Sequence, residues 1–299
     1  MQTVSLIYLF TLFVFLLILS LTLVNIKTSK TPSELPSPAV QINKNKAVPQ
    51  ETKNPKVEAL VKITQNPEGR WAIFIKDLKT QNTYELNSAE VFGAASIYKL
   101  AVMYKAYDAI ESDQLGKNTL LSGEKIAPDQ TTPFPNQTET VSYSVQEALR
   151  LMITISDNNA AILLSEKLGW ANIDKFMKQE GFSEINLVGA NSPNVTARSI
   201  SALLEKIYKK EAVNKKYSGE MIGLLLAQKV NDRIPKYLPA NIKVAHKTGE
   251  LEDLRHDAGI VYGKKGDYIF VFLSATAKPL DASETIATLS KEIFEELEK

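Results

Sequence analysis

The stretch AASIYKL, residues 94–100, places a serine three positions before a lysine. On a helix, residues three apart lie on one face a turn apart, so the Lys99 amine would lie beside the Ser96 hydroxyl. Such a pair suits a nucleophile and its base. It also suits an ordinary helix start with an exposed lysine, because S-x-x-K occurs by chance about once in a few hundred residues. The stretch alone leaves both interpretations open.

Two further motifs follow it in order. The stretch ISDNNAA contains Ser156–Asn158, and AHKTGEL contains Lys247–Gly249. Each tripeptide alone would fit a polar loop or the end of a strand. Together, S-x-x-K, S-D-N and K-T-G in this order form the signature set of the serine penicillin-recognising enzymes. The chain therefore resembles the class A β-lactamase and DD-peptidase superfamily, in its class A-like branch, over nearly all of residues 60–299. The alternative hydrolase motif G-x-S-x-G does not occur.

The order of the expected elements agrees with the fold that this resemblance implies. Strand-like runs occur near both ends of the domain, at 70–78, 81–87, 243–251, 256–263 and 267–276. Helical stretches fill 56–64, 144–154, 158–169, 171–181, 196–210, 217–228 and 282–299. Ser144 and Glu147 have the spacing of a capping box at one helix start. We expect an α/β (α+β) fold of the β-lactamase/transpeptidase type. In it, an antiparallel sheet flanked by helices packs beside an all-α lobe, with the active site between them.

The chemistry of acyl transfer assigns roles to three side chains. Ser96, at the start of a buried helix, would be the nucleophile, because backbone N–H groups there favour developing negative charge. Lys99 must be neutral near pH 7 to act as its base. Burial lowers a lysine pKa, and a second cation nearby lowers it further, so we expect Lys247 to keep the Lys99 pKa down. Ser156 would relay the proton to the leaving nitrogen.

The remaining site residues follow from the resemblance. It implies that the backbone N–H groups of Ser96 and Glu250 form the oxyanion hole. Asn158 would hold a substrate amide, and Lys247 with Thr248 would bind a substrate carboxylate. Gly249, which has no side chain, would let its strand lie close to the substrate. The expected catalytic residues are Ser96, Lys99, Ser156 and Glu250 through its backbone, and the expected substrate-binding residues are Asn158, Lys247, Thr248 and Gly249.

The chain departs from the class A pattern in one loop. Class A enzymes carry an omega-loop glutamate, in an E-x-x-L-N pattern, that activates the water of deacylation. The matching region, EGFSEINLVGANSPNVTAR at 180–198, lacks this pattern, and the nearest candidates, Glu184 and Asn186, have the wrong spacing. A solvated loop carboxylate is the simpler interpretation of Glu184. Acylation by β-lactams should therefore outpace hydrolysis of the acyl-enzyme.

Three functions remain open. The first is a class A-like β-lactamase that hydrolyses the β-lactam amide bond with slow deacylation. The second is a penicillin-binding DD-carboxypeptidase that acts on peptidoglycan stem peptides. The third is a non-catalytic module that binds the cell wall. The intact Ser96, Lys99, Ser156 and Lys247 argue against this third function.

Composition excludes several other functions. The formal net charge is +1, from 35 basic and 34 acidic residues. The protein therefore has no overall positive potential that would attract nucleic acid. The absence of cysteine excludes disulfides, thiolate catalysis and cysteine-ligated zinc. The two histidines, His246 and His256, match no metal-ligand spacing. The expected chemistry needs no metal or organic cofactor.

The N-terminal part of the sequence differs from the rest. No charged residue occurs from Val4 to Ile26, a length that spans a bilayer as a helix. The stretch lacks the basic start and small-residue cleavage site of a secretory signal, so we expect a transmembrane anchor at 1–26. A proline-rich linker at 27–56 and a catalytic domain at 57–299 would follow. Because peptidoglycan and β-lactams are met outside the membrane, we expect a single-pass membrane protein with an extracytoplasmic catalytic domain.

Overall fold

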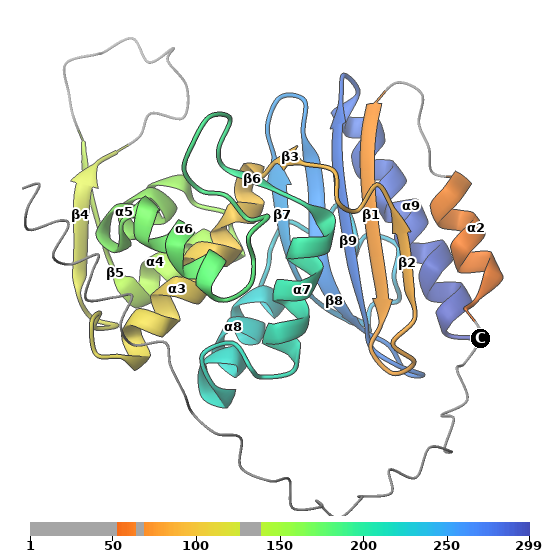
Figure 1. The fold of residues 1–299 in the computed structure, drawn as a ribbon, viewed down its shortest axis with the longest axis horizontal. Coiled ribbons are helices and arrows are strands. Elements are labelled where there is room, and N and C mark those ends of the chain that lie inside the picture. The colour runs from red at the N-terminus through yellow and green to blue at the C-terminus, as the bar shows by residue number, and fades with distance from the viewer. Residues whose placement is uncertain (1–52, 64–68, 126–138) are drawn as a thin grey trace, which may run out of the picture. The chain divides into compact units, whose positions relative to one another are not determined.

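Five strands form one antiparallel sheet in the order β2-β1-β9-β8-β7 (Figure 1). They are β1 (Gly69–Asp77), β2 (Thr83–Leu86), β7 (Lys243–Glu250), β8 (Arg255–Tyr262) and β9 (Tyr268–Thr276). The two N-terminal strands form an antiparallel hairpin, with Ile73 opposite Leu86, and β1 also pairs with β9 along its whole length. The predicted antiparallel sheet, built from strands near both ends of the domain, is confirmed.

The computed structural model describes residues 53–63, 69–125 and 139–299. The predicted anchor, 1–26, lies outside these ranges, as does all of the predicted linker before residue 53. Helix α2 (Pro55–Ile63) begins within the last two residues assigned to that linker. In the described ranges, none of the helices combines the length and the apolar character that crossing a membrane requires.

The sheet is buried on both faces, and its strands alternate between two cores. On β9, Ile269, Val271 and Leu273 pack with the helical lobe. The intervening Phe270 and Phe272 pack against α2 and α9 (Pro279–Leu297) on the other face. Successive side chains of a strand point to opposite faces, so a nearly continuous apolar run fills both cores.

The helical lobe lies beside the β7 edge (Figure 1). Its helices are α3 (Lys99–Glu111), α4 (Val145–Thr154), α5 (Asn158–Leu168), α6 (Trp170–Gln179) and α8 (Lys215–Leu226). Helix α7 (Ala197–Tyr208) lies on the face of the sheet, where it contacts β1 and β9. Two short strand pairs were not predicted from the sequence. These are β3 (Phe92–Gly93) with β6 (Asn194–Val195), and β4 (Leu120–Glu124) with β5 (Thr140–Ser144).

The start of α4 follows only half of the predicted capping box. The Ser144 hydroxyl accepts from the Glu147 backbone N–H at 3.2 Å, as an N-cap should. The Glu147 carboxylate pairs instead with the Arg150 guanidinium, at 2.6 and 2.9 Å. A charged partner one turn away thus replaces the return bond to the N-cap backbone.

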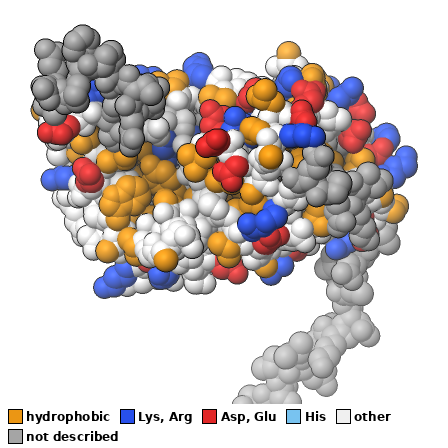
Figure 2. All heavy atoms as spheres, turned by 90° about the horizontal axis from the view of Figure 1, so that it is seen from above, with side chains coloured by type: hydrophobic (Ala, Val, Ile, Leu, Met, Phe, Trp, Pro, Cys, Tyr) orange, Lys and Arg blue, Asp and Glu red, His pale blue; other side chains and the backbone are white. Residues whose placement is uncertain are grey.

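Acidic and basic side chains are interspersed over the face that Figure 2 presents. This mixture fits the formal net charge of +1. The chemistry of the domain therefore has to come from local clusters of side chains.

Candidate active site

Ser96 lies in a short 3-10 helix, η1 (Ala95–Tyr98), that leads directly into α3. Residues three apart eclipse one another on a 3-10 turn, so Lys99 follows on the same side as Ser96. Ser96 is partly exposed, whereas Lys99 is fully buried. Ala95, just before Ser96, has a φ of 43°, in the left-handed region that a non-glycine residue rarely adopts. Such strain is concentrated at functional sites.

The Lys99 amine is surrounded by oxygen atoms from the S-D-N segment. Its Nζ lies 2.7 Å from the Ser156 carbonyl oxygen and 2.8 Å from Asn158 Oδ1. The Ser156 Oγ is 3.2 Å away. The Ser156 carbonyl oxygen and Asn158 Oδ1 can only accept hydrogen bonds, so each takes one N–H of the Lys99 amine. The Ser156 hydroxyl can donate a hydrogen bond as well as accept one. The arrangement therefore accommodates a neutral amine with its lone pair toward a hydroxyl.

Burial lowers the pKa of Lys99 to about 8, although the nearby Asp157 carboxylate acts in the opposite direction. A lysine with this pKa is neutral in about a tenth of molecules at pH 7. Burial, one of the two expected causes, thus lowers the Lys99 pKa, whereas the charge of Lys247 is not among the causes. The pKa of Lys247 is itself lowered well below its usual value, first by burial and then by the charge on Lys99.

Ser156 lies between the two lysines. Its Oγ is 2.9 Å from Lys247 Nζ, in addition to the contact with Lys99. Its φ of 59° is the second left-handed non-glycine conformation in this site. This conformation precedes α5, whose N-cap is Asp157, with its carboxylate accepting from the Ala160 N–H at 2.8 Å. Asp157 therefore caps α5, while its neighbours Ser156 and Asn158 contact the Lys99 amine.

Strand β7 packs against the turn that carries Ser96. A Cβ added at Gly249 would lie 3.0 Å from Ile97 Cγ1 and 3.3 Å from the Ile97 backbone nitrogen. A side chain at residue 249 would therefore collide with the turn that carries Ser96. The sequence did not predict this contact. The close approach places the backbones of Ser96 and Glu250, the predicted oxyanion hole, on adjoining segments. Thr248 is buried, and its carbonyl accepts from Lys247 at 2.6 Å.

The loop before α7 lies next to the nucleophile turn. The Pro193 carbonyl accepts from the Ala94 N–H at 2.8 Å, and Asn194 pairs with Gly93. Glu184 is the one carboxylate between residues 182 and 196. It is exposed and accepts from the Thr196 hydroxyl, at 2.7 Å, at the N-cap of α7.

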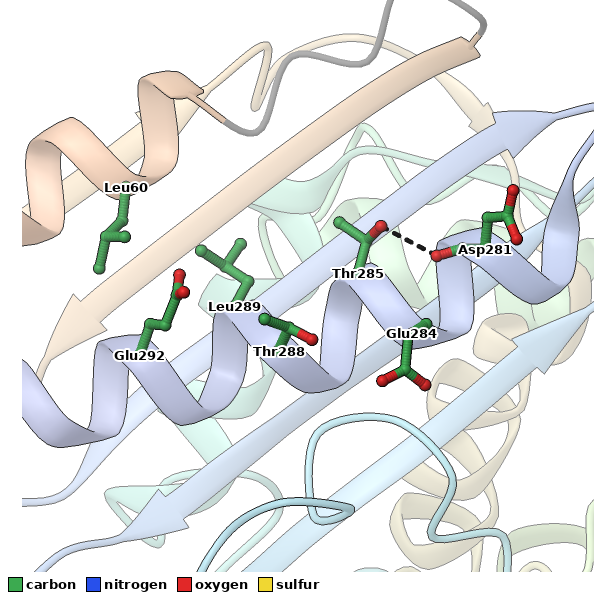
Figure 3. Close-up of a pocket in the computed structure, with 7 residues that line it drawn as sticks. All are labelled: Leu60, Asp281, Glu284, Thr285, Thr288, Leu289 and Glu292. Carbon is green, nitrogen blue, oxygen red and sulfur yellow. Dashed lines mark hydrogen bonds between the residues drawn. The ribbon is translucent and has the colours of Figure 1, made fainter.

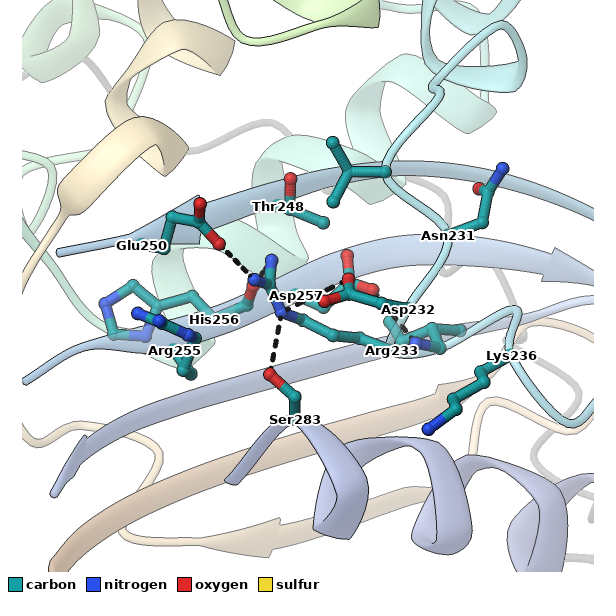
Figure 4. A network of polar contacts seen from close by, with 12 residues as sticks. Asn231, Asp232, Arg233, Lys236, Thr248, Glu250, Arg255, His256, Asp257 and Ser283 are labelled. Atoms are coloured by element: carbon teal, nitrogen blue, oxygen red, sulfur yellow. Dashed lines mark hydrogen bonds and ion pairs between the residues drawn. The ribbon is translucent and has the colours of Figure 1, made fainter. Parts of the chain in front are cut away.

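Sequence reasoning missed a polar network beside Thr248, drawn in Figure 4. The fully buried Arg233 pairs with the Glu250 carboxylate. His246 Nδ1 lies 2.9 Å from Asp257 Oδ1, within hydrogen-bond distance. His256 contacts the Gly93 carbonyl through Nε2 at 2.8 Å, and its Nδ1 accepts from the Ser274 N–H. The only signal in the sequence was the concentration of charged residues around HKTGE and RHD.

A hollow on the outer side of α9 has a volume of about 420 Å³ (Figure 3). Leu60 and Leu289 line it together with three carboxylates, and one of these, Glu284, already pairs with Lys236 and Tyr237. None of the predicted site residues lines it. Across the described ranges, histidine and carboxylate side chains form no group of three that could hold a metal ion.

Comparisons with known proteins identify relatives of this chain. A family model described as the Beta-lactamase enzyme family matches residues 54–297, which include every site residue above. Beta-lactamase BRO-1 of Moraxella catarrhalis is 25% identical over 179 residues, 52% of this chain and 56% of that enzyme. The chain thus spans about half the length of that relative. Beta-lactamase SME-1 of Serratia marcescens is 22% identical over 77% of this chain and 85% of its own length.

Among solved structures, PBP-A superposes with a TM-score of 0.71 over 81% of this chain and 94% of its own, at 22% identity. A mutant of PBP-A has been solved as an acyl-enzyme complex with penicillin G. These likenesses confirm the predicted fold.

Proposed function

Because the chain belongs to the beta-lactamase enzyme family, we propose that it is a serine hydrolase acylated at Ser96 by β-lactams. It would hydrolyse the β-lactam amide bond through this acyl-enzyme, with slow deacylation. The single observation that carries the proposal is the cluster in which Lys99 and Lys247 both contact the Ser156 hydroxyl. Three residues far apart in the chain meet there beside the Ser96 turn.

Acylation follows from these contacts. Neutral Lys99 takes the proton of the Ser96 hydroxyl as the oxygen attacks the carbonyl carbon of the lactam. The negative charge that develops on the carbonyl oxygen would be held by the backbone N–H groups of Ser96 and Glu250. The proton then passes through Ser156 to the lactam nitrogen, the C–N bond breaks and the acyl-Ser96 ester remains. The contacts of Lys99 and Ser156 would hold these two groups in place before substrate binds.

Among the described residues, the loop beside Ser96 offers no comparable group for deacylation. In the loop at 182–196, beside the turn that carries Ser96, Glu184 is the only carboxylate. It accepts a hydrogen bond from the Thr196 hydroxyl. Asn186 and Asn194 of the same loop bond to each other at 3.1 Å. Loss of one positioned general base typically slows a step by about 100 to 10,000-fold. We therefore expect the acyl-enzyme to accumulate.

The same observation favours a second candidate, a DD-carboxypeptidase for peptidoglycan stem peptides. An enzyme of this kind forms the acyl-enzyme from a peptide and is trapped by penicillin when water attacks slowly. Either substrate is met outside the membrane, so we propose an extracytoplasmic domain attached to the membrane by the segment at 1–26.

Time-resolved mass spectrometry of the protein mixed with penicillin G tests the proposal. We expect one drug mass to be added at Ser96 within seconds and to persist for minutes. Ser96→Ala should gain no mass while keeping its fold. An alanine variant that still gains the drug mass would exclude Ser96 as the nucleophile.

The lifetime of the adduct separates the candidates. Glu184→Gln should change this lifetime little, because the Glu184 carboxylate is hydrogen-bonded to Thr196 at the start of α7 and would not activate water at the ester. A wild-type enzyme that turns over penicillin many times per second, and slows in this variant, would make Glu184 the missing base. Slow release of penicillin with efficient cleavage of D-alanyl-D-alanine peptides would favour the carboxypeptidase.

A further inference from the structure

A cavity with a volume of about 620 Å³ lies between α8, the end of α7, the start of β7 and the end of β8. Helix α8 packs against β7 at this place (Figure 1). The cavity is larger than the hollow beside α9, and its size suits a small-molecule site. None of the residues assigned to the candidate active site lines it.

Most of the lining is apolar. Ile222 and Leu226 lie four residues apart on α8, so their side chains share one face of the helix. Tyr208 and Tyr262 add two aromatic rings, whose centroids are 6.4 Å apart. Leu226 stays 40% exposed. An apolar ligand in the cavity would therefore remove water from surface that the fold leaves wet.

The charge of the lining has one sign. Among the described residues, the charged side chains that line the cavity are those of Lys210 and Lys243, and both are exposed. Neither forms an ion pair with a described carboxylate, whereas Lys209, next to Lys210 in the chain, pairs with Glu205 at 2.7 Å. The two lysines are therefore available to a ligand.

The tyrosines add no negative charge to the cavity. Burial, together with the charge of Asp267, raises the pKa of Tyr208 and of Tyr262 to about 12, so both hydroxyls stay protonated at neutral pH. The Tyr208 hydroxyl donates to Asp267 Oδ2 at 2.9 Å, and this carboxylate is outside the lining. The two lysines thus determine the charge that a ligand in the cavity would meet.

We propose that this cavity is a binding site for a small aromatic carboxylate. The apolar side chains and the tyrosine rings would cover the aromatic body, and Lys210 and Lys243 would pair with the carboxylate at the rim. Small-molecule sites commonly combine a mainly apolar lining with a few placed polar groups. The proposal uses none of the residues assigned to acyl transfer, so it stands or falls independently of the proposed function.

Biphenyl-4-carboxylate and biphenyl-4-carboxamide, which differ in the charge of one group, test the role of the lysines. Equilibrium dialysis of the full chain gives a dissociation constant for each compound. The acid should bind with a dissociation constant below about 1 mM, and more tightly than the amide. Lys210→Gln combined with Lys243→Gln should weaken the acid by about threefold or more and leave the amide unchanged, because two exposed ion pairs are lost.

Lys167→Gln combined with Lys175→Gln is the matched control, because it removes two exposed charges from α5 and α6. It should leave both dissociation constants unchanged. Equal binding of the acid and the amide by the wild type, or no detectable binding of either, would overturn the proposal. This wild-type comparison decides even if a variant does not fold.

A second pair of variants locates the bound compounds. Gly219 lines the cavity, and a Cβ added there would meet no atom within 4 Å. Gly219→Leu should therefore fill part of the cavity without strain and weaken both compounds by about tenfold or more. Gly223→Leu adds the same side chain one turn further along α8, in open space outside the lining, and should leave binding unchanged. A Gly219→Leu protein that binds as tightly as this control would place the compounds elsewhere and contradict the proposal.

Discussion

The protonation of Lys99 controls the first chemical step that we propose. Its amine is fully buried among three oxygen atoms, and burial is the main cause that lowers its pKa to about 8. Only the neutral amine can accept the Ser96 proton. In the proposed mechanism, acylation near neutral pH therefore falls on the rising part of the Lys99 titration curve.

This position predicts a pH dependence for acylation. Below pH 8 the neutral fraction of Lys99 rises about tenfold per pH unit, so the acylation rate should do the same and level off above about pH 8.5. Quenched-flow measurement of the Ser96 adduct from pH 6 to 9 should show one inflection near 8.

Lys99→Arg is the control, because arginine keeps the positive charge and does not deprotonate in this range. It should lose the inflection and acylate about 100 to 10,000-fold more slowly. An arginine variant with the parent rate would mean that the base lies elsewhere, with Ser156 the next candidate.

At the scale of elements, the site depends on how closely β7 lies against η1. Gly249 faces Ile97 with room for a hydrogen atom and little more. The two segments carry the backbone N–H groups that would hold the oxyanion. Their separation should therefore affect the chemistry more than the stability of the fold.

Gly249→Ala should push the two segments apart by a few tenths of an ångström. We expect acylation to fall by about tenfold or more, because the N–H groups no longer meet at one point. The free energy of unfolding should fall by only about 1–3 kcal/mol, as for other overpacked sites. Penicillin labelling rates and urea unfolding measure the two effects.

The matched control is Gly223→Ala on α8, where an added Cβ meets no atom within 4 Å. Alanine there should stabilise the helix by up to about 1 kcal/mol and leave acylation unchanged. If Gly249→Ala acylates as fast as this control, the spacing of β7 and η1 does not matter to the reaction.

At the scale of the whole domain, His256 joins the sheet to the segment before the nucleophile. The ring accepts from the Ser274 N–H through Nδ1 and contacts the Gly93 carbonyl through Nε2, so the neutral form satisfies both contacts. Burial lowers the pKa of His256 to about 4, and the Arg233 charge adds to this effect. Protonation would break the bond to Ser274.

The stability of the fold should therefore fall in mild acid. Above pH 6.5 the ring is neutral in the folded and unfolded chains, and His256 adds no pH dependence. Between pH 6.5 and 4 the His256 ring is protonated in the unfolded chain but stays neutral in the folded chain. The folded state loses about 2 kcal/mol by pH 5 and about 3 kcal/mol by pH 4.

Urea unfolding at pH 7.5 and pH 5 measures this loss in the wild type. His256→Gln, which cannot titrate, should be less stable at pH 7.5 but lose about 2 kcal/mol less between the two pH values. Equal losses in both proteins would mean that His256 is not the group that senses acid.

The sequence by itself indicated most of the strands and helices and the candidate reacting residues, but not the short strand pairs β3–β6 and β4–β5. Apolar, strand-like runs indicated the strands, and the ordered motifs around Ser96, Ser156 and Lys247 indicated one acyl-transfer site. These features are readable because they depend on side chains within a few positions of each other. The predicted anchor at 1–26 remains a prediction of the same kind.

Only the tertiary structure decided which side chains meet across the fold. Gly93 and His256 are 163 positions apart, and Arg233, in the loop before β7, pairs with Glu250 at the end of that strand. The hydrogen bond from the Thr196 hydroxyl to Glu184, and the oxygen atoms that surround the Lys99 amine, also appear only in three dimensions. Such contacts depend on how the sheet and helices pack, and that packing depends on apolar contacts throughout the domain. No local pattern in the sequence records them.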